Sequence, residues 1–531
     1  MLTPYRPEPY VDFAEPEPRA KMIAALKDVR GKLGRTYPLR IGGKKIETDK
    51  KISSVMPAHY DTVVGYVSKA GHDQAEQAIQ TATETFKTWS RVDPETRARV
   101  LFKAAAIMRR RIYELSAWEC FEESKGWIEA YADVCETIDF LEFYGREMIR
   151  LGGPQEVTPF PGEDNELRYV PLGVGVVIPP WNFPLAICGG MTSATIVTGN
   201  TCVLKPASTA PVVAAIMCEI FEQAGLPPGV LDFLPGSGAE IGDYVVEHPQ
   251  TRYVAFTGSM EVGLGIYERC GRLSKGQIWL KRAILEMGGK DCIVVDETLI
   301  DDPAALDAAA DGIVYSAFGF QGQKCSACSR AIIHQDVYDT LLDKLVERAK
   351  KLTVGDTTGE ENLFMGAVID EASYKKINEY IAIGRKEGRL VLGGGPSGQL
   401  AGGSTPPPSG GYFIPPTIIA DVDRNARLAQ EEIFGPVLAV IKAKDFDDAL
   451  GIANGTIYGL TGALFSNDRF RLERARHEFH VGNLYFNRKC TGALVDVQPF
   501  GGFNLSGTDS KAGGRDYLLL FMQGKSITER L

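Results

Sequence analysis

The sequence predicts an α/β protein of more than one domain, in which helices cover both faces of parallel sheets. Three observations lead to this class. The chain has 531 residues, which is too long for one ordinary core and suggests two or three domains. Hydrophobic residues make up 44% and charged residues 24%, as is ordinary for a soluble globular enzyme. Short apolar segments alternate with helix-like segments through the middle of the chain.

The first 150 residues favour helices. Residues 1–50 are rich in proline and charge, with one helix-like stretch, PRAKMIAALKDVRGKL, at 18–33. Apolar side chains recur at three- and four-residue spacing through 73–150, which is typical of long amphipathic helices. The N-terminus has neither the apolar core of a signal peptide nor an Arg-rich amphipathic helix, so no targeting segment is expected.

Strand and helix then alternate four times between residues 173 and 271. The expected strands span 173–180, 200–206, 229–236 and 252–258, and the expected helices span 184–199, 210–225, 239–248 and 259–271. This is the pattern of a parallel sheet, and such sheets bind ligands at the carboxyl ends of their strands.

A second series follows, with an expected strand at 329–334 and a helix at 337–352. Asp336 is the expected N-cap of that helix, because its side chain can accept from a free N–H of the first turn. The Gly-, Pro- and Ser-rich segment 393–411 predicts an exposed loop.

Net charge and cysteine usage limit the classes of binding partner and the cellular compartment. A net charge of −10 and a pI near 5.4 argue against a nucleic-acid surface and fit a cytoplasmic protein. The ten cysteines are scattered in apolar context, as in a reducing compartment. No charged residue occurs from Tyr169 to Leu204, but four prolines interrupt this run. It therefore predicts a buried strand, a turn and a buried helix, and no membrane association.

Two cysteines lie close together in FGFQGQKCSACSR, at Cys325 and Cys328. Such a pair can be half a zinc site, a redox disulfide, or a nucleophile beside a bystander. A structural zinc site needs two more ligands, and the chain has no second Cys-x-x-Cys; its one close histidine pair is His477 and His480. No metal is therefore expected, whereas a redox disulfide remains an alternative.

Cys325 lies on a glycine-containing loop between a helical run and a strand. Lys324 and local backbone amides are expected to lower the pKa of its thiol, since a thiolate is stabilised by positive charge and by N–H donors. This position suits a nucleophile.

Two further motifs place polar groups at predicted strand ends. IPPWNFP carries Asn182, a neutral amide donor where substrates bind in such folds, although an Asx turn would use the same side chain. LEMGGK puts Glu286 at the end of an apolar strand, where desolvation should raise its pKa as a general base requires. A salt-bridged glutamate is the alternative.

Glycine-containing turns suggest where a phosphate could bind. GSGAEIG, at 236–242, departs from G-x-G-x-x-G and is weak evidence alone. FTGSMEVG is better, because Gly258 permits a tight turn and Ser259 opens a helix whose N-terminus offers free N–H groups. A plain N-capped helix is equally consistent. EEIFGPV places Phe434 before a Gly-Pro turn and is locally only a turn signal.

In this order PWNFP, FTGS, LEMGGK, GQKC and EEIFGPV resemble the aldehyde dehydrogenase superfamily, over nearly the whole chain. The stretches PGEDNELRYVPLGVG, AFGFQGQKCSA and FHVGNLYFNRKCTGALVDVQPFGGFNLSGTDSKAGG are similar to its Δ1-pyrroline-5-carboxylate dehydrogenase branch. The resemblance implies a Rossmann-type cofactor domain, an α/β catalytic domain and a small β oligomerisation element. The predicted boundaries are 1–153 with 172–284, then 285–510, and lastly 154–171 with 511–531.

The resemblance also implies residue roles. The nucleophile falls on Cys325, the general base on Glu286 and the oxyanion-stabilising amide on Asn182. The implied cofactor contacts are Pro179, Trp181, Lys205, Ser208, Gly258, Ser259, Glu432 and Phe434. The implied substrate contacts are Phe183, Ser326, Gly492, Ala493 and Phe500. Cys328 matches no family role and is expected to be a small packed side chain.

The implied reaction is the NAD-dependent oxidation of L-glutamate γ-semialdehyde, the open form of 1-pyrroline-5-carboxylate, to L-glutamate in the second step of proline degradation. Another semialdehyde, such as succinic semialdehyde, is the alternative. A thiol hydrolase without a redox step and a catalytically silent protein of this fold are rivals from other classes. Absence of NADH formation would favour the first, and an intact set of Cys325, Glu286 and Asn182 argues against the second.

The resemblance also bears on cofactor preference and on assembly. NAD-preferring members of the family often carry Glu three places after the residue matched by Lys205, and this chain has Ser208 there. NADP is therefore a possible cofactor beside NAD. The family suggests a homodimer, or a hexamer built as a trimer of dimers.

Overall fold

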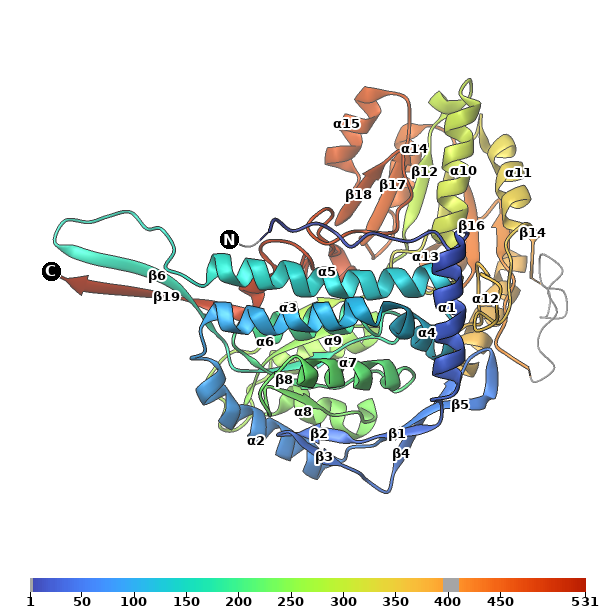
Figure 1. The fold of residues 1–531 in the computed structure, drawn as a ribbon. Helices are drawn as coiled ribbons and strands as arrows, with labels where there is room; N and C mark the ends of the chain where they lie inside the picture. Colours follow the sequence, from blue (N-terminus) through green and yellow to red (C-terminus); the bar gives the residue numbers. More distant parts are fainter. Residues whose placement is uncertain (1–2, 395–409) are drawn as a thin grey trace.

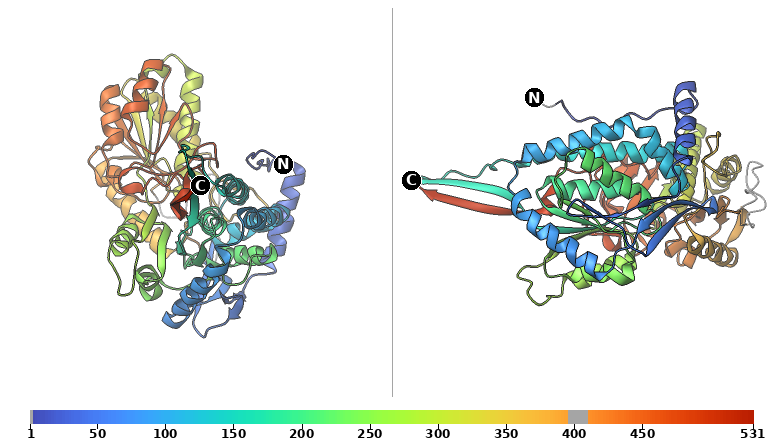
Figure 2. Two further views of the ribbon diagram at one scale, coloured as in Figure 1. Left: turned by 90° about the vertical axis from the view of Figure 1, so that its left-hand side faces the viewer. Right: turned by 60° about the horizontal axis from the view of Figure 1, so that its bottom comes forward.

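The computed structural model describes residues 3–394 and 410–531 (Figure 1). Within them the chain forms two seven-stranded sheets, a three-stranded sheet and a two-stranded ribbon. The two large sheets lie in separate lobes, seen apart in Figure 2. The predicted α/β class is confirmed, while the proposed domain boundaries stay a prediction.

The first large sheet contains the four predicted strands. Its order is β11 (Arg282–Glu286), β10 (Thr251–Thr257), β7 (Val174–Ile178), β8 (Thr201–Leu204), β9 (Leu231–Phe233), β2 (Leu39–Ile41) and β3 (Lys44–Ile46). The pairs from β11 to β9 are parallel, and β2 adds antiparallel to β9. Its central strands are apolar because helices bury both faces.

Helices cover the two faces of this sheet. The core on one face includes side chains from α2 (His72–Trp89), α8 (Asp243–Glu247) and α9 (Met260–Cys270). The other face is covered by α6 (Ala186–Val197) and α7 (Pro211–Gln223), with α3 (Pro94–Arg110), α4 (Ile112–Glu122) and α5 (Trp127–Leu151) outside them (Figure 1). The uncharged run is thus β7, a turn, α6 and β8, as predicted. No helix in the described ranges combines the length and apolarity needed to cross a membrane.

The second large sheet builds the other lobe. Its order is β14 (Arg389–Leu392), β15 (Thr417–Ala420), β16 (Val437–Ala443), β13 (Arg330–His334), β12 (Cys292–Val295), β17 (Thr461–Phe465) and β18 (Asn483–Phe486). Only the β14–β15 pair is antiparallel. The helices that pack with it are α10 (Pro303–Phe318), α11 (Tyr338–Ala349), α12 (Glu371–Glu387), α13 (Arg427–Gln430), α14 (Phe446–Asn454) and α15 (Arg469–Glu478).

A long ribbon projects from the body of the molecule (Figures 1 and 2). It pairs β6 (Glu163–Pro171) antiparallel with β19 (Met522–Arg530), from Pro171↔Met522 to Glu163↔Arg530. The two segments predicted to form a small β element thus lie side by side, although its role in oligomerisation stays a prediction.

The N-terminal region holds strands that the sequence analysis did not anticipate. After α1 (Pro16–Arg30), β5 (His59–Ser68) pairs with both β1 (Arg35–Tyr37) and β4 (Lys51–Met56). These strands are short or polar, so their periodicity is weak.

One local prediction was wrong. The N-cap of α11 is Val337, with no capping side chain, and Asp336 does not cap the helix. Asp336 instead turns back to the preceding strand, where its N–H donates to Nδ1 of His334 at 3.3 Å. The predicted loop at 393–411 falls mostly on residues 395–409, which lie outside the described residues.

Candidate active site

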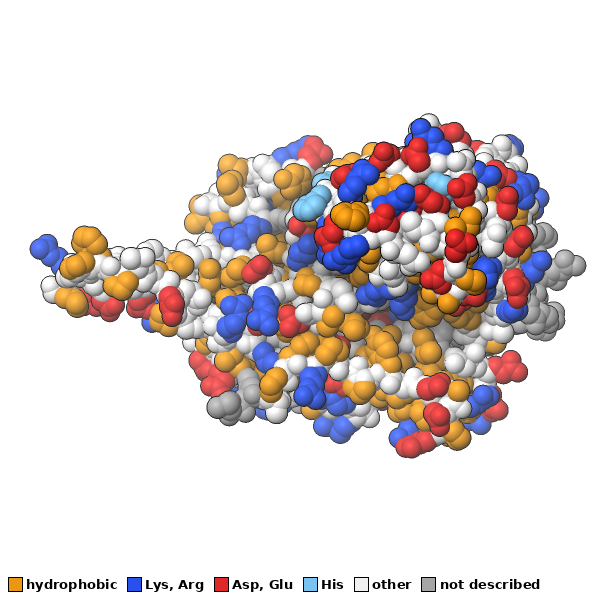
Figure 3. Space-filling model, turned by 90° about the horizontal axis from the view of Figure 1, so that it is seen from above, with side chains coloured by type: hydrophobic (Ala, Val, Ile, Leu, Met, Phe, Trp, Pro, Cys, Tyr) orange, Lys and Arg blue, Asp and Glu red, His pale blue; other side chains and the backbone are white. Residues whose placement is uncertain are grey.

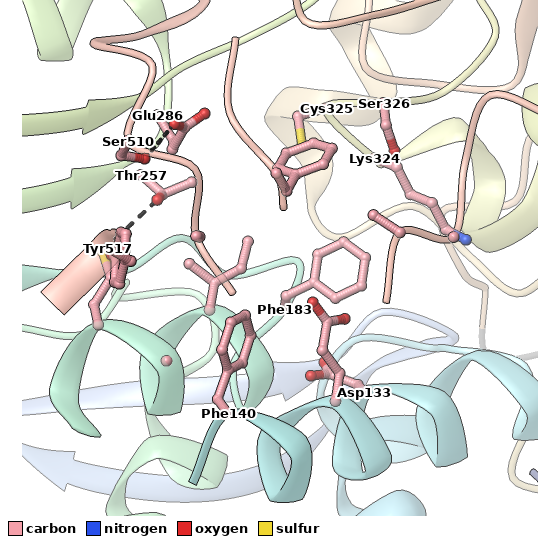
Figure 4. A pocket seen from close by; sticks show the side chains of 18 of the residues that line it. Asp133, Phe140, Phe183, Thr257, Glu286, Lys324, Cys325, Ser326, Ser510 and Tyr517 are labelled. Carbon is pink, nitrogen blue, oxygen red and sulfur yellow. Dashed lines mark hydrogen bonds between the residues drawn. The ribbon is translucent and has the colours of Figure 1, made fainter. Parts of the chain in front are cut away.

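One cavity gathers predicted site residues from both lobes (Figure 4). It lies near the carboxyl end of β11, the loop after β7, the loop between α10 and β13, and the loops after β18. Seven of the predicted residues line it: Phe183, Glu286, Cys325, Ser326, Gly492, Ala493 and Phe500. The carboxyl ends of strands in the first sheet thus meet loops of the second lobe at one site.

A strained turn positions the loop of Cys325. Phe320 and Gln321, directly after α10, adopt left-handed φ angles of 49° and 57°, which cost about 1–2 kcal/mol per residue. The buried Gln321 amide offsets this strain by donating to the carbonyls of Ser124 at 3.0 Å and Ala367 at 2.8 Å. The nucleophile loop is therefore tied to two other segments of the chain.

The thiol of Cys325 faces the cavity but is held protonated. Burial raises its pKa well above the usual value, and the nearby carboxyl groups of Asp291 and Glu286 add to the effect. The N–H of Ser326 lowers the pKa, as expected of a backbone amide, but burial outweighs it.

Lys324 does not supply the positive charge that the sequence predicted for this thiol. Its ammonium lies 2.7 Å from the carboxylate of Glu129 on α5 and extends away from the Cys325 sulfur (Figure 4). The prediction that Lys324 lowers the thiol pKa was wrong, because a buried acid on another helix pairs with this lysine.

Glu286 is the last residue of β11, as predicted, and pairs with Thr257 at the end of β10. Burial raises the pKa of its carboxyl to about 8. One oxygen accepts from the hydroxyl of Ser510, and the other is buried without a partner among the described residues. No other described residue forms a salt bridge with this carboxyl, so its free oxygen can exchange a proton with a water molecule in the cavity.

Asn182 lies behind the nucleophile loop. It is buried, and its amide Nδ2 donates to the carbonyl of Gln323 at 2.9 Å. It makes no Asx turn in the described part of the chain, so that alternative was wrong. Its hydrogen-bond partner, Gln323, thus lies two residues before Cys325 on the same loop. Asn182 itself does not line the cavity.

An acidic helix face forms the opposite wall and was missed by the sequence analysis. Glu129, Asp133 and Glu136 of α5 all line the cavity, at the spacing of one helix face. Glu129 pairs with Lys324, and Asp133 pairs with the fully buried Lys125. We call these three residues the acidic face. Acids recurring at this spacing among the buried apolar residues of the helix were the available signal.

Glu136 is the member of the acidic face without a basic partner in the described part of the chain. Burial, with the neighbouring carboxyls of Asp133 and Asp139, raises its pKa to about 8. A positively charged ligand group in the cavity would therefore find an acceptor here.

Lys125 also supports an aromatic wall. Its ammonium lies 4.8 Å from the ring centre of Phe183 and 5.1 Å from that of Phe320. A buried cation against a ring face is an attractive contact, so the Phe183 ring is held in place from behind. Phe500 contributes a second ring to the lining.

The loop of residues 490–494, here called the cradle loop, presents backbone N–H groups. Arg488 donates to the carbonyl oxygens of Thr491 at 3.0 Å and Gly492 at 3.2 Å. In a trans peptide the C=O and N–H point to opposite sides, so the N–H groups of Gly492 and Ala493 face away from Arg488. Neither donates to an acceptor in the described ranges. Successive free N–H groups of this kind bind anions.

The implied cofactor residues lie at neighbouring strand ends of the first sheet. Pro179 and Trp181 follow β7, Lys205 follows β8, and Gly258 with Ser259 follows β10. The Ser259 hydroxyl caps α9 by accepting from the N–H of Val262 at 3.4 Å, as predicted. Ser208 is exposed in the turn after β8.

The remaining two implied cofactor residues come from the second lobe. Phe434, with a left-handed φ of 62°, packs edge-on against Trp181, with ring centres 5.6 Å apart. Glu432 accepts from the N–H of Gly289 at 3.0 Å. The ammonium of Lys205 is buried and has no carboxylate partner in the described chain, and desolvation lowers its pKa to about 8. This unpartnered donor fits the hydroxyl groups of a nucleotide ribose.

Cys328 is a buried core residue, as expected, and its thiol donates to the carbonyl of Arg330 at 3.4 Å. All ten cysteines are free thiols, so the structure contains no redox disulfide at Cys325 and Cys328. Within the described residues no group of three His, Cys, Asp or Glu side chains is placed to hold a metal ion.

Known proteins are similar to this chain over nearly its whole length. The model of the aldehyde dehydrogenase family matches residues 45–527. The chain is 59% identical over 529 residues to a 1-pyrroline-5-carboxylate dehydrogenase of Geobacillus thermodenitrificans, with 100% of each chain covered. The fold is similar to that of a Thermus 1-pyrroline-5-carboxylate dehydrogenase with bound NAD, at 53% identity, a TM-score of 0.95 and full coverage of both chains. A Staphylococcus aureus betaine aldehyde dehydrogenase with NAD⁺ is similar at 27% identity and a TM-score of 0.85, over 95% and 96% of the two chains.

Proposed function

The chain belongs to the aldehyde dehydrogenase family, and from this premise we propose that it oxidises L-glutamate γ-semialdehyde to L-glutamate with NAD. The observation that carries the proposal is the cavity itself. A thiol and an unpaired carboxyl lie beside free backbone N–H groups and an acidic helix face. The relatives named 1-pyrroline-5-carboxylate dehydrogenase match this chain over its full length, which favours the open form of that compound as substrate.

In the proposed reaction, Cys325 releases its thiol proton to solvent water and adds through its sulfur to the aldehyde carbon. The N–H of Cys325 and the amide of Asn182 bind the resulting oxyanion. Asn182 reaches that oxygen by exchanging its bond to the carbonyl of Gln323 for one to the substrate. NAD, when bound, accepts the hydride, and Cys325 then carries the acyl group as a thioester.

Glu286 completes the reaction as a general base. Its unpartnered oxygen takes a proton from the water that attacks the thioester, and the acid leaves with Cys325 restored to a thiol. Because burial holds the pKa of Glu286 at about 8, only a fraction of this group is ionised at neutral pH.

The residues at the strand ends would hold the dinucleotide. Lys205 would donate to ribose hydroxyls, and the N-terminus of α9 at Ser259 would receive a phosphate. Glu432 would accept from the second ribose. The remaining contacts are assigned to Pro179, Trp181, Gly258 and Phe434. Ser208 carries no negative charge that would repel a 2′-phosphate, so we propose measurable use of NADP beside NAD.

The substrate's amino-acid head would occupy the end of the cavity opposite Glu286. Its carboxylate would accept from the N–H groups of Gly492 and Ala493 and from the Ser326 hydroxyl. Its ammonium would face Glu136. The aliphatic chain would lie between the rings of Phe183 and Phe500. Succinic semialdehyde has no amino group for Glu136, and this favours the glutamate compound.

The test is NADH formation with a panel of aldehydes. Charge-assisted hydrogen bonds contribute about 1.5–3 kcal/mol each, so two or three of them should favour glutamate semialdehyde over propanal by at least ~100-fold in kcat/KM. Equal efficiency on propanal, succinic semialdehyde and glutamate semialdehyde would contradict the proposed substrate. A carboxylic acid released without NADH would point to the thiol hydrolase instead.

We also propose a cytoplasmic homodimer, or a hexamer built from three dimers. Two surfaces support self-association. The β6–β19 ribbon projects into solvent, with exposed Phe160 just before β6 and exposed Leu531 just after β19, and apolar side chains are visible on it in Figure 3. The loop after α9 exposes Ile278 and Leu280 at 86% and 80%. Replacing Ile278 and Leu280 by Glu should reduce the mass measured by light scattering; an unchanged mass would exclude this loop from the interface.

A further inference from the structure

We propose that Arg488 and Lys489, the two basic residues before the cradle loop, make the cavity selective for aldehydes that carry a carboxylate. Arg488 is a positioning residue that aims the N–H groups of the loop, and Lys489 supplies positive charge behind them. This inference rests on the proposed function, because it concerns the same cavity and names what selects its substrate.

Arg488 holds the cradle loop from its outer side. Its guanidinium lies 4.4 Å from the ring centre of Tyr485 in β18, which anchors it to the sheet, and it binds the carbonyls of Thr491 and Gly492. With both carbonyls engaged there, both following N–H groups are directed inward. Gly492 has a left-handed φ of 76°, which a side chain would strain.

Lys489 lies directly behind the same loop. Its ammonium is 3.9 Å from the ring centre of Tyr315, and a Cβ atom at Gly492 would be 3.4 Å from that nitrogen. Lys489 makes no ion pair in the described chain. Its charge therefore acts on whatever the N–H groups of the loop hold.

A second lysine near Tyr315 leaves an excess of positive charge there. The ammonium of Lys324 lies 6.0 Å from the same ring centre and is paired with Glu129. Among the described residues, Glu129 is thus the one carboxylate in ion-pair contact with either ammonium group. Burial, with the charge of Lys324, lowers the pKa of Lys489 to about 8, which is consistent with an excess of positive charge at this place.

A substrate carboxylate bound to the cradle loop would place two carboxylates, its own and that of Glu129, beside the ammonium groups of Lys324 and Lys489. An uncharged aldehyde leaves the imbalance unchanged. Because this region is largely shielded from solvent, the charge of Lys489 is screened less than at an open surface. The expected result is selection for a carboxylate at a fixed distance from the aldehyde.

The alternative is that Lys489 merely packs on an aromatic ring, as Lys442 of β16 does over Tyr338 at 4.4 Å. Lys442→Met is therefore a matched control for Lys489→Met. Three aldehydes with five-carbon chains separate the effects: glutamate semialdehyde, glutarate semialdehyde, which lacks the amino group, and pentanal, which lacks both charged groups.

Lys489→Met should lower kcat/KM about tenfold for the two carboxylated aldehydes and leave pentanal unchanged, mainly through KM. Lys489→Arg should keep most of the preference, and Lys442→Met should change nothing. An equal loss on all three aldehydes in Lys489→Met and in the milder Lys489→Gln would overturn the proposal, as would no loss on any.

Arg488→Met should likewise raise KM for the carboxylated aldehydes about tenfold, while kcat on pentanal stays the same. Arg488→Lys, with one donor group in place of a fork, should restore part of the effect. If Arg488→Met changed pentanal as much as glutarate semialdehyde, a purely structural role would replace the one proposed.

Different results would contradict the proposed function and the proposed roles of Arg488 and Lys489. If the unmutated enzyme did not favour glutamate semialdehyde over pentanal, the proposed function would fail. The ratio between glutarate semialdehyde and pentanal would still test Arg488 and Lys489, because these two substrates differ in the carboxylate alone.

Discussion

The two ends of the cavity differ in structure and in charge. At the reacting end, Glu286 and Thr257 terminate adjacent strands, and Cys325 follows a strained turn tied down by a buried amide. Burial keeps both the thiol and the carboxyl protonated near neutral pH. At the recognition end, a helix face and a loop carry opposite charges. The reacting end should therefore set the rate for every aldehyde, and the recognition end should decide which aldehyde reacts.

The largest effect should come from the nucleophile. Cys325→Ala removes the atom that bonds to the substrate and should lower turnover at least ~1,000-fold with every aldehyde. Cys328→Ser should keep most of the activity, because its thiol is packed in the core and donates to the carbonyl of Arg330, away from the cavity lining. Steady-state NADH formation measures both. Equal losses in the two variants would refute the assignment.

Glu286→Gln should have the second-largest effect on turnover. It removes the base that activates water, and general-base help is worth roughly 100- to 10,000-fold. Hydride transfer precedes this step, so rapid mixing should show a burst of NADH followed by slow turnover. A linear time course would contradict the role of Glu286, once cofactor release has been shown not to limit the rate.

The pH dependence of thioester hydrolysis should provide a second test of the role of Glu286. Since the pKa of Glu286 is about 8, the ionised base becomes more abundant as pH rises. Thioester hydrolysis should accelerate by up to about tenfold per pH unit below 8 and level off above it. The Glu286→Gln variant should lose this rise. A rate independent of pH between 6 and 8 in the unmutated enzyme would show that Glu286 ionises far below its expected pKa when substrate is bound.

A smaller and more selective effect is expected at the recognition end. Glu136→Gln should lower kcat/KM for glutamate semialdehyde about tenfold to a hundredfold, because a charge-assisted bond to the ammonium is worth about 1.5–3 kcal/mol. Glutarate semialdehyde, which has no amino group, serves as the control and should be unaffected. If both substrates suffered equally, Glu136 would belong functionally to the reacting end.

The smallest change is expected outside the cavity. Ser208→Glu should increase the preference for NAD over NADP by about tenfold, because a carboxylate can accept from ribose hydroxyls and repels a 2′-phosphate. The exposed position of Ser208 makes an effect on folding small. Measuring kcat/KM for both cofactors tests this, and an unchanged ratio would remove Ser208 from the cofactor site.

The sequence by itself determined the features that depend on neighbours along the chain. The alternating periods between 173 and 271 predicted β7 to α9 in order, because strands and helices bury side chains at different spacings. The apolar run before Glu286 predicted its raised pKa, and the serine before a helical period predicted the cap at Ser259. The strands β1 to β5, which are three residues long or begin with polar residues, gave no such signal and were missed.

Only the tertiary structure decided which charged groups meet. Lys324 pairs with Glu129 of α5 rather than acting on its neighbour Cys325, and Asn182 bonds to the loop of Gln323. These partners are distant in sequence, and the energy of a charge depends on the burial and the groups around it in space. Order along the chain therefore identified the reacting groups, whereas burial in the folded cavity set their charge states, and α5, packed on α6, supplied the acidic face of the recognition end.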